Sequence, residues 1–115
     1  MSSSRRSELG RLGEEAAVEL LRKAGYVVVG RNIRLPGGEI DIVCLDGDVV
    51  VFVEVKSRSN AVYGTALGAV DARKRAKLRA LAADYLQVVG PGRRARFDVV
   101  TCERGGLKVH KGAFA

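Results

Sequence analysis

Thiol and imidazole side chains, which form disulfide bonds and bind zinc, are scarce in this sequence, which has two cysteines and one histidine among its 115 residues. Cys44 and Cys102 both lie inside apolar, strand-like runs, and neither belongs to a CxxC pair. We therefore expect buried free thiols in a reducing compartment, and neither a disulfide nor a zinc site. His110 stands alone near the end of the chain, which argues against a histidine-based catalytic centre.

Long apolar runs are also absent, and the longest fall far short of the roughly 20 residues that a membrane-spanning helix needs. Residues 1–6 are polar and basic and lack the apolar segment of a signal peptide, so we expect a cytoplasmic protein with no membrane partner. An adaptor at a membrane surface or on an acidic protein is a weaker third idea. No basic amphipathic helix with bulky aromatic residues supports it.

What the sequence does have is a globular composition with an excess of positive charge. Hydrophobic residues make up 47% of the chain, and its net charge is +7. The length suits a single domain, which we place at residues 8–115 after a disordered tail at 1–7. The charge favours an anionic partner, with nucleic acid first and an acidic membrane second, while a basic protein without such a partner stays open.

Hydrophobic periodicity and turn residues predict an α/β chain without internal repeats or linkers. The first helix is expected to begin after Ser7 as its cap. Its buried face is predicted to consist of Leu9, Gly13, Ala16, Ala17, Leu20 and Ala24. Asp71 is expected to cap the second helix. The predicted helices span 8–24 and 71–88, and the predicted strands span 26–31, 39–45, 49–56, 96–102 and 107–111.

The strand at 49–56 is the most informative stretch. It begins as a continuous apolar run, which is typical of a central strand buried on both faces. It ends with Glu54 and Lys56, whose side chains point to the same side of the sheet because they are two residues apart. Buried charges are costly unless they are paired or bind a metal. A structural ion pair and a reactive site are both consistent with this pattern.

The turn before that strand decides which residues accompany Glu54. Asp46-Gly47 is a strong hairpin signal, and a two-residue turn there places Asp41 across from Phe52 with Glu54 as its diagonal neighbour. Any loop of even length keeps Asp41 and Glu54 on one face, whereas a three-residue loop separates them. The favoured turn therefore brings two carboxylates and Lys56 together.

Other charged residues flank this group. Glu14 lies at the border of the apolar face of the first helix, where it either reaches a site under the sheet or is solvated. Lys74 lies on the inner stripe of the second helix, near its start. Arg34, Arg58 and Lys74 are candidate phosphate contacts, and surface solvation explains them equally well.

The carboxylate pair suits metal-dependent chemistry. Hard divalent cations such as Mg²⁺ prefer carboxylate and water oxygens, and Asp41 with Glu54 could supply them. A cation held there would polarise a phosphate and lower the pKa of a bound water. Lys56 could orient that water or stabilise charge in the transition state.

A family resemblance agrees with this interpretation. Gly38-Glu39-Ile40-Asp41 and the segment Phe52-Val53-Glu54-Val55-Lys56-Ser57-Arg58 resemble the D…ExK core of the restriction-endonuclease-like nuclease superfamily. Nearly the whole chain is similar to the uncharacterised bacterial YraN-like family. Gly10-Arg11-Leu12-Gly13-Glu14 resembles the helix that carries a metal-site glutamate in archaeal Holliday-junction resolvases. Ile40 stands where the superfamily often has proline, and Glu39 is an additional carboxylate that either binds metal or forms a salt bridge.

The resemblance implies a three-layer α/β/α sandwich around a mixed sheet, with a phosphodiesterase site that uses Mg²⁺ or Mn²⁺. Glu14, Asp41 and Glu54 would then be metal ligands, and Lys56 would complete the catalytic set. The resolvases act as dimers on branched DNA, which implies a homodimer here. We therefore expect an endonuclease or resolvase-like enzyme acting on structured DNA. The alternative is a nucleic-acid-binding module with the same fold and weak or no cleavage.

Overall fold

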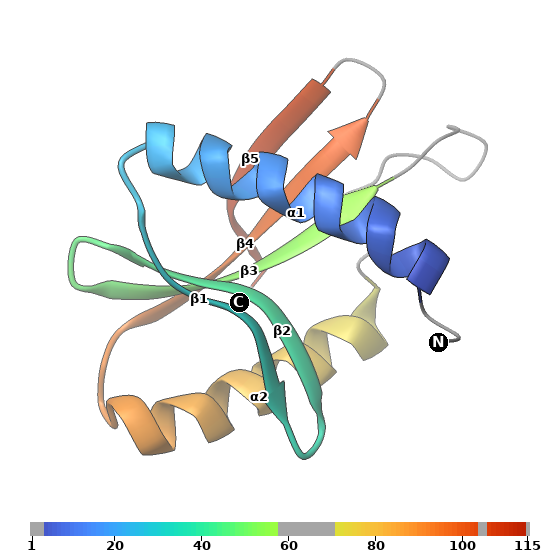
Figure 1. Cartoon of the computed structure of the whole chain (residues 1–115). Helices are drawn as coiled ribbons and strands as arrows, with labels where there is room; N and C mark the ends of the chain where they lie inside the picture. Colours follow the sequence, from blue (N-terminus) through green and yellow to red (C-terminus); the bar gives the residue numbers. More distant parts are fainter. Residues whose placement is uncertain (1–3, 58–70, 104–105, 115) are drawn as a thin grey trace.

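The computed structural model describes residues 4–57, 71–103 and 106–114. Its elements follow one another along the chain as two helices and five strands (Figure 1). They are α1 (Ser4–Lys23), β1 (Val27–Leu35), β2 (Gly38–Asp46), β3 (Val49–Ser57), α2 (Ala72–Val89), β4 (Ala95–Glu103) and β5 (Gly106–Phe114).

The strands form one mixed sheet in the order β1-β2-β3-β4-β5. Neighbouring strands are antiparallel except β3 and β4, which are parallel and are joined by the crossover that contains α2. The two helices lie on opposite faces of the sheet (Figure 1). This is the three-layer α/β/α sandwich that the resemblance implied.

Each face of the sheet has its own hydrophobic core, and β3 contributes to both. Val51 and Val53 pack under α1 with Leu21 and Ile42. Val50 and Phe52 alternate with them and pack on the other face with residues of α2. The prediction that this strand is central and buried on both sides is confirmed.

The first helix differs from its prediction in start and in orientation. It begins at Ser4, so residues 4–7, which we expected in a disordered tail, are helical and Ser7 is not the cap. Among residues 13–23 of this helix, Ala17 is buried as predicted, together with Val18 and Leu21, whereas Ala16 and, just after the helix, Ala24 are exposed. The buried stripe is thus rotated by about one residue, which puts Glu14 in line with it at helical spacing.

The turn between β2 and β3 also corrects the prediction. The two strands pair from Asp46 opposite Val49, so the two-residue turn is Gly47-Asp48 and not Asp46-Gly47. Gly47 adopts φ 63°, a conformation that glycine reaches without steric cost. Because the loop is still two residues long, the parity of the paired residues is kept while the register shifts by one residue on each strand. Regular pairing ends at Ile42–Val53, and the same register continued by one residue would set Asp41 opposite Glu54 in place of Phe52.

The second helix follows the prediction closely. Asp71 is its N-cap and accepts a hydrogen bond of 2.9 Å from the backbone N–H of Lys74. Leu78, Leu81 and Ala82 are buried against the sheet. Among the helical residues that the structure describes, no segment is long and apolar enough to cross a membrane.

A buried polar network ties the start of β1 to β4 and β5. Asp98 is fully buried and accepts hydrogen bonds from Tyr26 Oη (2.7 Å), Arg96 Nε (2.9 Å) and the backbone N–H of Gly112 (3.0 Å). Arg96 also donates to Asp46 at 2.9 Å. Burial and the bond to Asp98 raise the pKa of Tyr26, so it stays a proton donor. This carboxylate is well satisfied, which supports the structural role that we assign to it.

Replacing Asp98 should therefore test the fold. We expect Asp98→Asn to lower the free energy of unfolding by about 2–4 kcal/mol, because Arg96 loses its buried partner and donors are left unmatched. Tyr26→Phe, which removes one donor, should cost about 1–2 kcal/mol. Urea unfolding followed by circular dichroism measures both, and an unchanged midpoint for Asp98→Asn would contradict the assignment.

Candidate functional site

Asp41 lies where β2 separates from β3. Regular pairing between the two strands ends at Ile42 opposite Val53. Beyond that point β3 is hydrogen-bonded to the side chain of Asp41. Its Oδ2 accepts a hydrogen bond of 2.9 Å from the backbone N–H of Val55. A side chain thus replaces the departing backbone as acceptor, which holds Asp41 against β3 close to Glu54.

Glu54 is the buried charge of the site, with 5% of its surface exposed. Its Oε2 lies 3.4 Å from Lys74 Nζ and 3.8 Å from Lys56 Nζ. Burial, followed by repulsion from Asp41, raises its pKa to about 7 despite the opposing effect of the two lysines. The ionised carboxylate is therefore held at a net cost, which is not what a stabilising ion pair does.

The two lysines reach Glu54 from different elements. Lys56 follows it on β3, and Lys74 comes from the first turn of α2, whose N-cap bond fixes the backbone of the same residue. Each lysine side chain is about one third exposed, at 33% and 34%. The placement of Lys74 on the inner stripe of its helix is confirmed, and its ammonium group approaches Glu54 more closely than that of Lys56 does.

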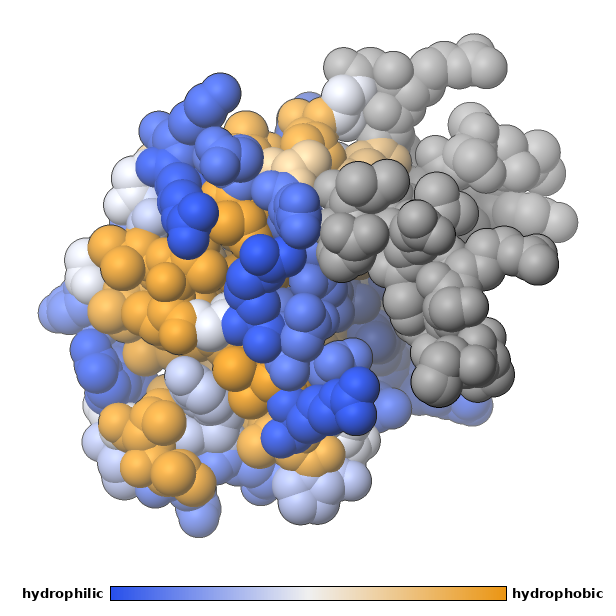
Figure 2. Space-filling view, in the orientation of Figure 1, coloured by the Kyte–Doolittle hydropathy of each residue, from blue (hydrophilic) through white to orange (hydrophobic). Residues whose placement is uncertain are grey.

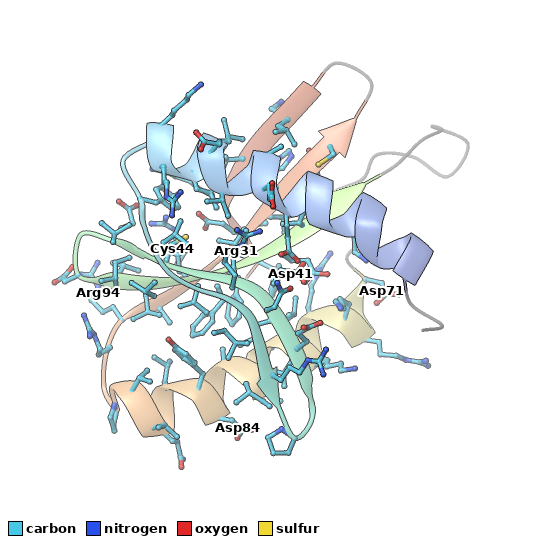
Figure 3. The ribbon with its side chains drawn as sticks, in the orientation of Figure 1. Arg31, Asp41, Cys44, Asp71, Asp84 and Arg94 are labelled. Carbon is cyan, nitrogen blue, oxygen red and sulfur yellow. The ribbon has the colours of Figure 1, made fainter. Side chains whose placement is uncertain are left out.

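Glu14 reaches the same region from the opposite layer. Its side chain is 13% exposed, and its Oε1 lies 3.7 Å from Arg31 Nη2 on β1. Burial and then repulsion from Asp41 raise its pKa, while a hydrogen bond from the Asn32 side chain and the charge of Arg31 oppose the rise. The negative charge of Asp41 thus contributes to the raised pKa of both glutamates. Figure 3 shows Arg31 and Asp41 on the strands beneath α1, with Asp71 at the start of α2.

Not every candidate joins this cluster. Arg34 is 90% exposed and lies 3.7 Å from Glu39 near the end of the β1–β2 hairpin. Glu39 therefore forms a salt bridge there, and its charge also contributes weakly to the raised pKa of Glu14. Arg58 lies outside the described residues.

Two participants were missed from the sequence, Arg31 and Asn32. Arg31 is the last residue of the predicted strand, and Asn32 lies in the part of β1 that extends past it. Pairing of Arg31 with Ile42 puts Asn32 next in register to Asp41. The signal was the length of the hairpin: a turn at Pro36-Gly37 alone, instead of the longer gap between the predicted strands 26–31 and 39–45, would have aligned these residues with Asp41.

The cluster combines three carboxylates with three cations. Glu14, Asp41 and Glu54 lie near Arg31, Lys56 and Lys74. Burial and repulsion from Asp41 keep the pKa values of both glutamates raised. A divalent cation would relieve this repulsion, and the donors are the hard oxygens that Mg²⁺ or Mn²⁺ prefers. In the described part of the chain, however, no three His, Cys, Asp or Glu side chains form a group able to hold a metal. The fit is thus to a site with two carboxylates completed by water, which is common for Mg²⁺.

Comparison with known proteins gives a consistent result along the whole chain. Residues 13–102 match the family described as "Uncharacterised protein family UPF0102". A UPF0102 protein of Moorella thermoacetica is 49% identical over 121 aligned positions, which cover 99% of this chain and 100% of that protein. UPF0102 proteins of Symbiobacterium thermophilum and Pseudomonas aeruginosa are 48% and 47% identical, covering 84% and 82% of this chain and 83% and 77% of their own lengths.

The raised pKa of Glu54 predicts how folding stability depends on pH. Below about pH 4.5 Glu54 is protonated in both states and costs nothing. Between 4.5 and about 7 the unfolded chain has lost the proton while the folded chain retains it, so stability falls as pH rises. At about 1.36 kcal/mol per pKa unit, the loss is limited to about 3 kcal/mol.

Glu54→Gln should remove this contribution and make the protein about 1–3 kcal/mol more stable than the wild type at pH 8. Urea unfolding at several pH values between 4.5 and 8 measures the difference. The exposed Glu19→Gln on α1 is the matched control, and its stability should track the wild type. If Glu54→Gln is less stable than the wild type at pH 8, Glu54 is a structural ion-pair residue.

Proposed function

Because the chain belongs to the UPF0102 family, whose description names no activity, we propose from the site itself that it is a metal-dependent phosphodiesterase. More specifically, we propose an endonuclease or resolvase-like enzyme with a restriction-endonuclease-like fold that cleaves structured DNA. The observation that carries the proposal is the placement of Asp41 beside Glu54, with Lys56 two residues further along the same strand.

The electrostatics of Glu54 support a reactive site over a structural ion pair. Perturbed carboxylates gather at functional sites because catalysis requires charges that folding alone does not favour. Asp98 offers the contrast within the same protein, since its charge is met by hydrogen bonds from three residues. Glu54 is nearly as buried, yet burial and repulsion from Asp41 raise its pKa by more than its two lysines lower it.

Each residue then has a role that its position allows. Asp41 and Glu54 would hold Mg²⁺ or Mn²⁺, which when bound supplies Lewis-acid stabilisation of charge on the phosphate. Both lysines approach Oε2 of Glu54, at 3.8 Å and 3.4 Å. Lys56 would orient the attacking water or stabilise negative charge on the phosphate. Glu14 would assist through a water molecule.

The surface charge suits a nucleic-acid backbone. The chain carries 20 lysine and arginine residues against 13 acidic residues. Arg31, Lys56 and Lys74 lie at the site with their side chains about one third exposed, and Arg34 is nearby at the end of the hairpin. Hydrophilic residues, drawn blue, form a band down the middle of the face in Figure 2. Contacts of this kind to phosphates position DNA without reading its sequence.

A second candidate is a nucleic-acid-binding module that retains the fold and has weak or no cleavage. Two observations favour it. The described residues hold no three-ligand metal group, and Lys56 and Lys74 already partner Glu54. In such a module the lysines would neutralise Glu54 permanently, and binding would depend on salt because phosphate contacts release counterions.

Cation binding separates these candidates before any substrate is known. We expect Mn²⁺ titrated into the wild type in a calorimeter to bind, and Asp41→Asn combined with Glu54→Gln to abolish binding because both oxygen donors lose their charge. The control pair Asp48→Asn with Glu19→Gln changes two exposed carboxylates and should bind as the wild type does. Unchanged binding in the site variant would show that these residues are not the ligands.

Cleavage of labelled branched, forked and linear DNA with Mg²⁺ or Mn²⁺ tests the activity. We expect Glu54→Gln and Lys56→Ala each to reduce the rate at least about 100-fold, since one loses a ligand and the other a charge at the phosphate. Glu19→Gln should cleave normally. Equal activity in all four proteins would remove the site assignment. Salt-sensitive binding of every substrate without cleavage would favour the binding module.

A further inference from the structure

Asn32 has an unusual backbone for a strand residue. Its φ is 50°, and among the described residues it is the only one other than glycine with positive φ. Residues other than glycine rarely adopt this backbone region, and asparagine tolerates it better than most. The conformation occurs inside β1, between Arg31, which pairs with Ile42, and Ile33, which pairs with Ile40. Asn32 is therefore next in register to Asp41.

The hairpin changes face at this pair of residues. Ile42 packs in the core beneath α1, whereas Ile40 packs in the core on the α2 side. Two residues of a regular strand that are two positions apart point to the same face. Across the hairpin the same change occurs, because Arg31 contacts Glu14 of α1 while Ile33 packs on the α2 side. Asp41 and Asn32 are the positions between the two halves.

This change of face puts Asp41 within reach of both layers. Its carboxylate is hydrogen-bonded to β3 next to Glu54, which contacts Lys74 of α2, while Glu14 of α1 contacts Arg31, the residue before Asn32. A regular β1–β2 hairpin would direct Asp41 to one face only. The side chain of Asn32 adds a second contribution, because it hydrogen-bonds Glu14.

We propose that Asn32 is a positioning residue of the site: its left-handed backbone turns Asp41 to the junction of the two layers, and its side-chain amide holds the Glu14 carboxylate toward Asp41. The inference rests on the proposed function in that Glu14 and Asp41 act together there. Partners of this kind, one step removed from a metal, orient the groups that act on it.

Glycine and alanine substitutions separate the two contributions. Glycine adopts φ 50° freely, so Asn32→Gly retains the backbone and removes only the amide. Asn32→Ala removes the amide and strains the backbone as well. We expect Asn32→Gly to weaken Mn²⁺ binding about tenfold, and Asn32→Ala to weaken it further and to lower the urea midpoint. Val27→Ala, at an exposed position of the same strand, is the control and should bind Mn²⁺ as the wild type does.

A purely structural role for Asn32 predicts a different result. If only the backbone conformation matters, Asn32→Gly binds Mn²⁺ like the wild type, and that outcome overturns the proposal. A metal-free measurement keeps the test independent of the proposed function. In EDTA, Asn32→Gly should lower the urea midpoint more in the parent chain than in the Glu14→Gln variant, because only the parent retains the charged partner.

The two failures can be told apart. If the wild type binds no Mn²⁺ and cleaves no DNA, the proposed function fails, and the urea measurements alone decide on Asn32. Equal shifts in the two backgrounds then overturn its contact with Glu14. Unequal shifts show that Asn32 holds Glu14 in the folded protein whatever the site does.

Discussion

The constraint on which the site depends is the burial of Glu54 next to Asp41. Two carboxylates in a poorly hydrated place repel each other, and each loses hydration that neutral residues would not need. Lys56 and Lys74 reduce the cost, but the raised pKa of Glu54 shows that they do not remove it. Glu14 extends the same repulsion into the opposite layer. A fold selected only for stability would place apolar or fully paired residues here.

The architecture explains how these charges meet. A central strand buried on both faces has no room for a charge except near its end, where the neighbouring strand departs. β2 leaves β3 directly after Ile42, and the Asp41 carboxylate takes the hydrogen bond from Val55 that the missing backbone would have accepted. The helices on either face then contribute one side chain each, Glu14 from α1 and Lys74 from α2. The separation of two strands thus creates a place that both outer layers can reach.

The protein contains two charged networks that differ in how well they are satisfied. Asp98 lies beneath α1 at the irregularity between β4 and β5, where Tyr26, Arg96 and Gly112 donate to it. That network joins the beginning of β1 to the last two strands. In the cluster around Asp41, by contrast, the negative charge of Asp41 repels those of Glu14 and Glu54. The contrast between them is a physical reason to place function at the second network, and it does not depend on any resemblance.

Local patterns in the sequence determined the elements, the double burial of β3, the cap at Asp71 and the inward position of Lys74, because these follow from periodicity and from contacts within a few residues. They also determined that Asp41 and Glu54 share a face, since any two-residue turn preserves that parity. The tertiary structure decided the register, because the turn at Gly47-Asp48 pairs Val43 with Phe52 and so brings Asp41 next to Glu54 where the pairing ends. It also decided the rotation of α1 and the change of face at Asn32. Both depend on how distant segments pack, and no local pattern in the chain records that packing.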